Sequence, residues 1–443
     1  MTAFRHGIAS ADPLPDGVLL WTRCTTDAGS PVSVGWWIGV TPDHVVARGT
    51  AEASPAGDYT VHVDVTGLEP ATDYRYGFTF GDDASPVGHT RTAPAGAGGE
   101  EAPLRIGVAS CSYWSCGFFN AYANMAARDL DLVVHVGDYI YENDTFSYSR
   151  RAMRAHRPAG RLLTLAQYRA RYAQYRTDPD LQALHARHPM SAVWDDHELA
   201  GGAWADGAYA HNPDLDGPWE ERRRAAVQAY REWMPLRRAG QESVYRALRL
   251  GPLADLVLLD TRLVGREQPV LNTRRPAWRV GDEPRGLLGE DQWRWLEDAA
   301  SASTARWLLI GNQVMLAPAR GLDLAGGIGL NPGQWDGYPA ERRRLYDLLR
   351  RSGWASDVAV LSGDIHSSWA ADLPVGAEFV SPSVTTDNFV RTALPRVPGL
   401  PALARRLLLW QNPHLRMVDL HHHGYVTLDV TAAPIQGDLW HFE

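Results

Sequence analysis

The sequence predicts an α/β domain preceded by a small β-sandwich, and three observations lead to this fold class. The first 95 or so residues contain short runs rich in β-branched and aromatic residues, which are typical of strands. Residues 96–103 have the glycine- and alanine-rich composition of a linker. From residue 104 to residue 443, short apolar segments alternate with amphipathic ones, as in domains that alternate strands with helices.

The segment before the linker contains several strand patterns. Residues 18–23 and 32–38 are predicted strands, and residues 59–65 alternate with a period of two, as a half-buried strand does. Residues 67–76 form a turn that leads into a tyrosine-bearing strand, which is the tyrosine-corner pattern of β-sandwiches. We therefore expect residues 1–95 to form a module similar to fibronectin type III.

Five helices are predicted after the linker, at residues 118–128, 164–176, 219–233, 289–301 and 339–351. In the third, Ala226, Tyr230 and Trp233 lie on one face at spacings of four and three, so that face is expected to be buried. The apolar segments between the helices are the predicted strands of the domain at 104–443.

Composition and charge exclude several kinds of chemistry. All 43 basic residues of the 443 are arginine, so a Schiff-base lysine, a phosphate-loop lysine and a Ser-Lys dyad are excluded. The net charge of -9 argues against nucleic acid as the main partner, and three cysteines cannot form a disulfide framework. No apolar run approaches the ~20 residues of a membrane span, and no signal-peptide pattern opens the chain. We expect a cytoplasmic protein, or a mature exported form without its leader; the sequence does not indicate an oligomeric state.

Four predicted strands end in residues that bind metals or move protons. The strands at 104–109, 132–136, 190–194 and 358–362 are followed, in that order, by Cys111, by Asp138 and Tyr141, by Asp195, Asp196 and His197, and by Asp364 and His366. In open α/β sheets, ligands bind beyond the carboxyl ends of the strands, so these side chains are expected to meet at one edge.

The mixture of donors narrows the choice of metal. The Cys111 thiol and the Tyr141 phenol become anionic ligands only when they lose a proton, which a highly charged cation favours. Beside carboxylates and an imidazole, they fit ferric iron better than a zinc site dominated by Cys and His. The remaining carboxylates suit a second, harder cation, with Asp138 able to bridge the two. Two metals ~3.5–4 Å apart form a clamp for in-line attack at phosphorus.

Five segments together resemble the alkaline phosphatase D (PhoD) family, and they occur in the family's order over nearly the whole chain. They are residues 4–13, residues 109–111, Gly137-Asp138-Tyr139-Ile140-Tyr141-Glu142, Trp194-Asp195-Asp196-His197-Glu198 and residues 363–369. The resemblance implies a four-layer α/β/β/α calcineurin-like metallophosphoesterase domain after the sandwich. It also implies a metal-dependent phosphoric ester hydrolase, in which a metal-bound hydroxide attacks a small-molecule phosphate ester.

The resemblance also implies roles for individual residues. The implied iron ligands are Cys111, Asp138, Tyr141 and His366, and the implied calcium ligands are Asp138 and Asp364. Asp196 takes the place of a metal-binding asparagine of general metallophosphoesterases, and His197 that of their proton donor or charge stabiliser. Arg222 or Arg223 is in the place of a phosphate-binding arginine.

One departure from the family affects the second cation. The family usually has asparagines after the Asp-His-Glu stretch, one of them a ligand of the calcium site, but this chain has Gly201 and Gly202. Neither glycine offers a side-chain oxygen. We therefore expect a second divalent cation, with calcium as the first choice, at a site that is altered and weaker, differently occupied or absent.

Three further residues are candidates for binding the substrate: Asn312, which follows the strand at 307–311, Trp204 and His423. His423 belongs to the triplet 421–423, which precedes a predicted strand and is interpreted as internal structure. Alternative activities are a phosphodiesterase or phospholipase-D-like enzyme and a biosynthetic phosphatase with one dedicated substrate. A degenerate phosphate-binding protein, motivated by Gly201 and Gly202, is the alternative from another class.

Overall fold

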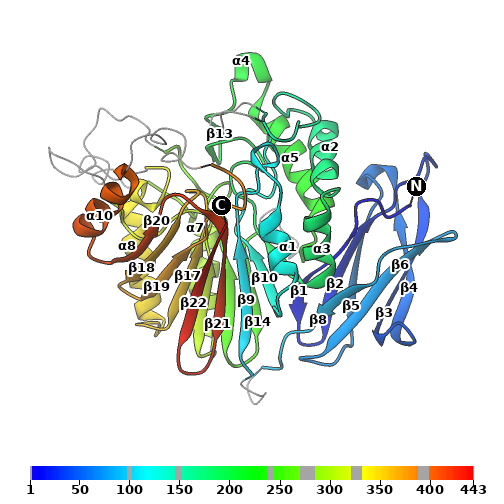
Figure 1. Cartoon of the computed structure of the whole chain (residues 1–443), viewed down its shortest axis with the longest axis horizontal. Helices are drawn as coiled ribbons and strands as arrows, with labels where there is room; N and C mark the ends of the chain where they lie inside the picture. The colour runs from blue at the N-terminus through cyan, green and yellow to red at the C-terminus, as the bar shows by residue number, and fades with distance from the viewer. Residues whose placement is uncertain are drawn as a thin grey trace.

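Two β-sheets lie face to face in the main domain, and helices cover their outer faces (Figure 1). The structure is a computed structural model that describes residues 2–96, 102–144, 152–237, 244–269, 285–320, 332–387 and 399–442. The predicted α/β class, with four layers after a β-rich N-terminal part, is confirmed.

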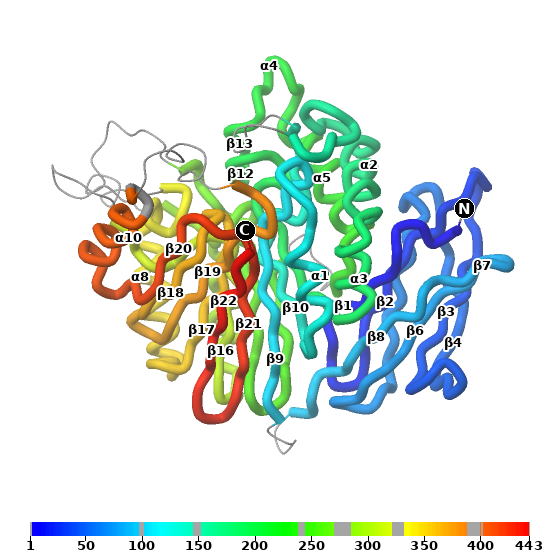
Figure 2. Tube along the Cα trace, viewed as in Figure 1, coloured from blue at the N-terminus to red at the C-terminus, as the bar shows by residue number. Residues whose placement is uncertain are grey.

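The first sheet brings together segments from both ends and the middle of the chain (Figure 2). Its order is β22 (Ile435–Phe442), β21 (His423–Val430), β9 (Leu104–Ala109), β10 (Leu132–His135), β11 (Met190–Ala192), β1 (Ile8–Leu14), β2 (Gly17–Arg23) and β5 (Thr60–Thr66). Strands β9, β10 and β11 are parallel, so their carboxyl ends reach the same edge of the sheet. Strand β21, the second to last of the chain, pairs antiparallel with β9.

The second sheet supplies the remaining central strands. Its order is β14 (Arg246–Leu250), β15 (Ala254–Leu258), β16 (Trp307–Gly311), β17 (Val358–Ser362), β19 (Gly376–Val380), β18 (Ser368–Leu373) and β20 (Leu415–Asp419). Successive side chains of β15 point to opposite faces. Leu256 and Leu258 pack in the core shared with the first sheet, whereas Val257 packs with Trp293 of the helix layer. The second sheet is therefore buried on both faces.

All five predicted helices are present, with ends within two residues of the predicted ones. On the first sheet lie α1 (Asn120–Ala126), α2 (Leu165–Tyr175), α3 (Pro179–Arg187) and α5 (Trp219–Trp233), and on the second α7 (Glu290–Ala302) and α8 (Pro339–Arg351). Two further helices are α4 (Pro213–Asp216), which is short, and α10 (Leu400–Gln411). Local sequence sets the helix starts: Thr164 and Gln167 form a capping box before α2, and the Asp178 side chain caps α3.

The N-terminal strands form two sheets around a core of their own. Strands β1, β2 and β5 face β3 (Val32–Thr41), β4 (His44–Ala53), β6 (Asp73–Phe80), β7 (Asp83–Ala84) and β8 (Gly88–Arg91), with Val18 and Val34 between them. The predicted tyrosine corner is present, since the Tyr74 hydroxyl accepts a hydrogen bond of 2.9 Å from the Glu69 amide. Strand β1 also pairs with β11 at one position, so one sheet runs on into the main domain. The boundaries at residues 95 and 103 stay a prediction.

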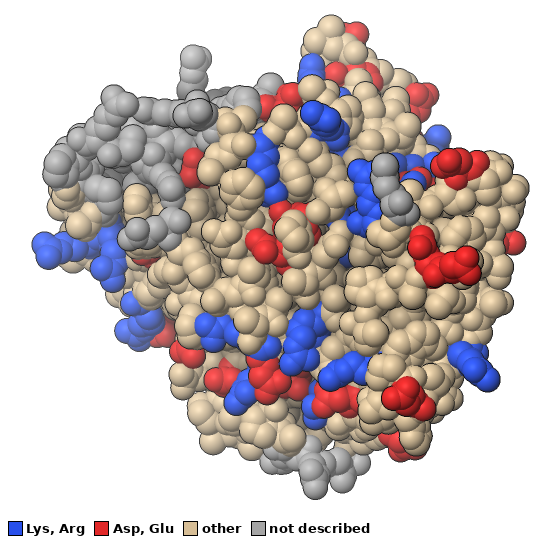
Figure 3. Space-filling model, turned by 45° about the vertical axis from the view of Figure 1, so that its right-hand side comes forward, with Lys and Arg blue, Asp and Glu red and all other residues tan. Residues whose placement is uncertain are grey.

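The surface in Figure 3 carries arginine and acidic side chains close together. Outside the grey residues, neither sign of charge gathers into one extended patch on the face shown. Among the residues that the structure describes, no helix has the length and apolar character needed to cross a membrane.

Candidate active site

The residues that follow the parallel strands have an unusual backbone conformation. The φ angles of Cys111, Asp138, Asp364 and His366 are 60°, 57°, 66° and 52°. Non-glycine residues rarely adopt positive φ, which costs about 1–3 kcal/mol each, and such residues cluster at functional sites. Close packing maintains these turns: a Cβ atom on Gly137 would lie 2.4 Å from the Asp195 Cβ. Strained turns at the ends of β9 and β10 of the first sheet and of β17 of the second sheet thus carry these side chains, so the predicted meeting point lies between two sheets and not at the edge of one.

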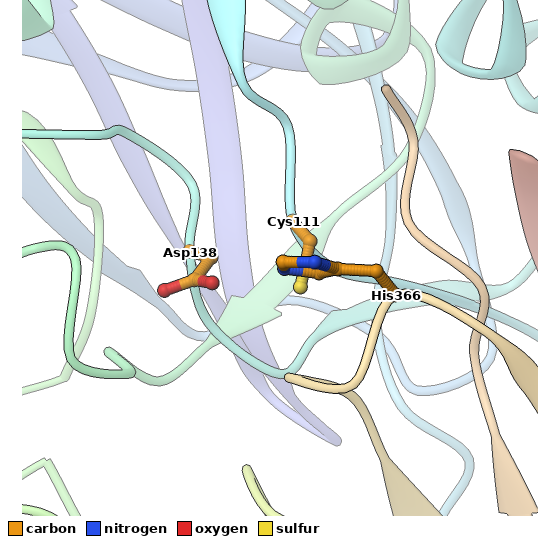
Figure 4. A group of neighbouring side chains, drawn as sticks. All are labelled: Cys111, Asp138 and His366. Carbon is orange, nitrogen blue, oxygen red and sulfur yellow. The ribbon is translucent and has the colours of Figure 1, made fainter. Parts of the chain in front are cut away.

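Three of these side chains form a group that could hold a metal ion. One ligand atom each from Cys111, Asp138 and His366 lies within 4.8 Å of the others, and all three residues are buried. Figure 4 shows the sulfur, the carboxylate and the imidazole arriving from three separate segments. Burial raises the pKa of the Cys111 thiol and of the Asp138 carboxyl well above their ordinary values. A bound cation would reverse this effect, because it favours the deprotonated ligands.

Tyr141 lies against this group, as a fourth ligand would. Its hydroxyl donates a hydrogen bond of 3.0 Å to Asp138 Oδ2 and lies 3.4 Å from His366 Nε2. The Tyr141 ring lies between the rings of Tyr113 and His197, at centroid distances of 4.3 Å and 4.2 Å. The structure therefore brings together all four side chains that the sequence assigns to iron.

His197 forms an ion pair that faces the pocket. Its Nδ1 lies 2.7 Å from Glu142 Oε2, and the Gly201 amide donates to Glu142 Oε1 at 2.8 Å. Burial alone would lower the pKa of His197, but the carboxylates of Glu142, Asp196 and Asp138 outweigh it and raise this pKa well above 6.5. These charges therefore favour the protonated form of His197, and Glu142 holds its ring in place.

Glu198 fixes the loops that carry the metal-binding residues. Its buried carboxylate accepts hydrogen bonds from the backbone amides of Asp138, Tyr139 and Asp195, at 3.0, 2.6 and 2.8 Å. Burial raises the pKa of Glu198 to about 7. One side chain thus ties the loop after β10 to the loop after β11.

Arg262 lies among a second group of carboxylates. Ligand atoms of Asp195, Asp196 and Asp364 lie within 4.8 Å of one another. Arg262 Nη2 donates to Asp364 Oδ1 at 2.6 Å and lies 3.4 Å from Asp196 Oδ1, while its Nε donates to Asp195. Asp196 Oδ1 is buried and has no hydrogen-bond partner among the described residues, so part of the cation-binding capacity of this group remains.

A pocket of about 550 Å³ opens over both groups. It is lined by Asp138, Asn143, Asp196, His197, Gly201, Gly202, Tyr209, Ala210, Arg262, Arg266, Pro269, Gly333, Gln334, Asp364, Ile365 and His366. Carboxylates lie next to two arginines and His197. This arrangement can bind a cation and an anionic group side by side.

The predicted phosphate-binding arginines lie elsewhere. Arg222 is buried in α5 and donates to the Tyr168 hydroxyl and to the Ala210 carbonyl. Arg223, the next residue of the helix, is half-buried and pairs with Glu220 at 3.4 Å. Neither lines the pocket, because the orientation of the helix points one arginine into the core and the other outward.

The three predicted substrate-binding residues are also outside the pocket lining. The Asn312 side chain donates to the Val314 carbonyl and accepts from Trp335 Nε1 at 3.1 Å. Trp204 packs on Tyr209, with ring centroids 5.2 Å apart. His423 Nδ1 lies 3.0 Å from the Ser383 hydroxyl. The side chains of Asn312, Trp204 and His423 therefore contact neighbouring residues and do not line the pocket.

The sequence interpretation missed Arg262 and Arg266 as pocket residues. A usable signal existed, because β15 is a fully buried strand and Arg262 follows it closely, like the other strand-end residues. Glu142 and Glu198 lie inside the motifs already recognised, but their partners became visible only in the structure.

Comparisons with known proteins show to which family the chain is similar. The family model for PhoD-like phosphatase matches residues 106–439, and the model for the N-terminal domain of such phosphatases matches residues 1–94. Alkaline phosphatase D of Bacillus subtilis (strain 168) is 37% identical over 461 residues, which cover 98% of this chain and 77% of that protein. A solved structure of PhoD matches with a TM-score of 0.88 and 33% identity, over 99% of this chain and 86% of the other.

Proposed function

Since the chain belongs to the PhoD-like phosphatase family and is a metal-dependent phosphoric ester hydrolase, we propose that ferric iron is its principal cation. The observation that carries this proposal is the convergence of Cys111, Asp138, Tyr141 and His366. A phenolate beside a thiolate is unusual for zinc, and a more highly charged ion favours the deprotonated form of both ligands. When bound, such a cation supplies Lewis acidity and activates water for attack on phosphorus.

The chain's own residues bind and orient the phosphate group. We place the anionic oxygens of the ester beside Arg262 and Arg266, because these arginines line the pocket next to the metal-binding residues. Arginine suits this role, since its planar fork can donate two hydrogen bonds to one phosphate. Arg266 Nε is buried without a hydrogen-bond partner among the described residues. Arg222 and Arg223, in contrast, would support the helix rather than touch the ester.

His197 would protonate the leaving oxygen of the ester. It lines the pocket, and the ion pair with Glu142 keeps its ring both oriented and charged. A general acid must be protonated at the working pH and within reach of the departing atom. Transfer of this proton would leave a neutral imidazole that solvent can protonate again.

For the second cation we propose a weakly held calcium ion at Asp138, Asp196 and Asp364. Asp196 Oδ1, which accepts no hydrogen bond from the described residues, and the oxygen-rich surroundings support a hard cation. Two features weaken the site. Gly201 and Gly202 contribute no side-chain oxygen, and the Arg262 guanidinium already neutralises part of the carboxylate charge.

Parallel assays on nitrophenyl phosphate and bis-nitrophenyl phosphate test the proposal for substrate class. We expect hydrolysis of the monoester to have the higher kcat/KM, because Arg262, Arg266 and the cation can together neutralise a dianion. A clear preference for the diester would support the phosphodiesterase or phospholipase-D-like alternative instead. If kcat/KM is similar for the two nitrophenyl esters and one natural metabolite is turned over rapidly, the result would support a dedicated biosynthetic phosphatase.

A further inference from the structure

A separate cluster of metal-capable side chains lies where edge strands of the two main sheets meet. Asp419 ends β20, the edge strand of the second sheet, and His441 lies in β22, the edge strand of the first. His422 lies in the connection between β20 and β21. One ligand atom from each of the three residues lies within 4.8 Å of the others.

The carboxylate of this cluster is fixed and ionised. Asp419 Oδ1 accepts hydrogen bonds of 2.9 Å from the backbone amides of His421 and His422, and Oδ2 lies 3.0 Å from His422 Nδ1. Partial burial by itself raises the pKa of Asp419, but these hydrogen bonds outweigh it and lower the pKa to about 2. The carboxylate is therefore charged over the whole neutral range.

Hydrogen bonds also orient both imidazoles. The rings of His422 and His441 are nearly parallel, at 16°, with centroids 5.3 Å apart. His441 Nε2 lies 2.9 Å from the Ser368 hydroxyl. Metal-ligating histidines commonly use one ring nitrogen for such a partner and the other for the metal. Burial lowers the pKa of His441, so its ring is neutral and able to ligate at neutral pH.

We propose that Asp419, His422 and His441 form a binding site for Zn²⁺ that joins the edges of the two sheets. Two imidazole nitrogens and one carboxylate oxygen are ligands that zinc accepts, whereas calcium and magnesium prefer oxygen alone. The side chains of Asp419 and His422 are 24% and 35% exposed, so the ion can enter from solvent and keep water as its remaining ligand. This site does not depend on the phosphatase proposal.

Zinc titration of the full-length protein as purified tests the site. The free zinc concentration would be followed with a chromophoric indicator, in the parent protein and in the His422→Ala/His441→Ala double variant. His44→Ala provides a matched control, because His44 is an exposed histidine on β4 in the N-terminal module. We expect the parent and the control to bind one more zinc equivalent than the double variant does.

The same comparison is made by thermal unfolding. Added zinc should raise the unfolding temperature of the parent and the control more than that of the double variant. Zinc that enters the active site would do so in all three proteins, so the difference isolates the cluster. His441→Ala alone, at an exposed position, provides a second variant if the double one folds poorly. Equal zinc stoichiometry and equal thermal shifts in all four proteins would overturn the proposal.

Discussion

Replacing Arg262 by methionine should remove the positive charge that lies among three carboxylates and allow a calcium ion to bind there more tightly. Arg262 is buried among Asp195, Asp196 and Asp364, and its two hydrogen bonds to carboxylates are charge-assisted. Such bonds contribute about 1.5–3 kcal/mol each. Removal of one partner from a buried ionic network costs about 3–5 kcal/mol, which agrees with the sum. We therefore predict that Arg262→Met loses about 3–5 kcal/mol of unfolding free energy in EGTA.

Calcium should restore much of this loss. With three carboxylates uncompensated, the variant should bind calcium more tightly than the parent. A ligand present at 100 times its Kd stabilises the folded state by about 2.7 kcal/mol. The assay is urea unfolding of both proteins in EGTA and in millimolar calcium.

Arg266→Met provides the matched control for this experiment. The Arg266 guanidinium donates to the Thr261 and Gly333 carbonyls rather than to the three carboxylates. This variant should therefore lose stability without a selective rescue by calcium. If calcium affinity in Arg262→Met equals that of the parent, or if Arg266→Met is rescued equally, the account of Arg262 as a partial replacement for the second cation is refuted.

Three more predictions concern residues around the pocket. Tyr141→Phe should remove the tyrosinate absorption of the ferric protein from the visible spectrum. Tyr113→Phe, which removes the hydroxyl from the ring stacked on Tyr141, should keep this absorption. Glu142→Gln should lower the raised pKa of His197. Because the proposed reaction uses protonated His197 as the acid, the fall of kcat with rising pH should then begin at lower pH, and an unchanged profile would exclude His197 as the acid. Gly201→Asn would place a Cβ 3.1 Å from His197 Cε1, a tight contact that requires a small shift of that ring, and the folded variant should bind calcium more tightly by isothermal calorimetry; a folded variant with unchanged affinity would count against the missing-ligand argument.

The candidate metal-binding residues could be predicted because local sequence places them at strand ends. Cys111, Asp138 and His366 each follow an apolar parallel strand within a few residues, but that β9 and β10 lie in one sheet and β17 in the other is visible only in the structure. Their positive φ angles could not be predicted, because packing against the neighbouring loops, and not residue type, imposes that conformation.

The arginines could not be assigned from sequence alone. Arg222 and Arg223 are adjacent on one helix, and only the tertiary orientation of α5 shows that one is buried against Tyr168 and the other pairs with Glu220. Arg262 follows β15 of the second sheet and contacts Asp195 after β11 of the first sheet and Asp364 after β17 of its own sheet, across more than sixty residues of sequence. Long-range contacts of this kind leave no periodic signal in the chain.

Elemental analysis of active protein, as purified, tests the central claim most directly. The account predicts iron in an amount close to one atom per chain, with activity proportional to iron content across preparations. Calcium should be present in smaller amounts and should be lost to EGTA before iron is. Fully active protein that contains zinc at full occupancy and no iron would contradict the assignment of Cys111, Asp138, Tyr141 and His366 as an iron site.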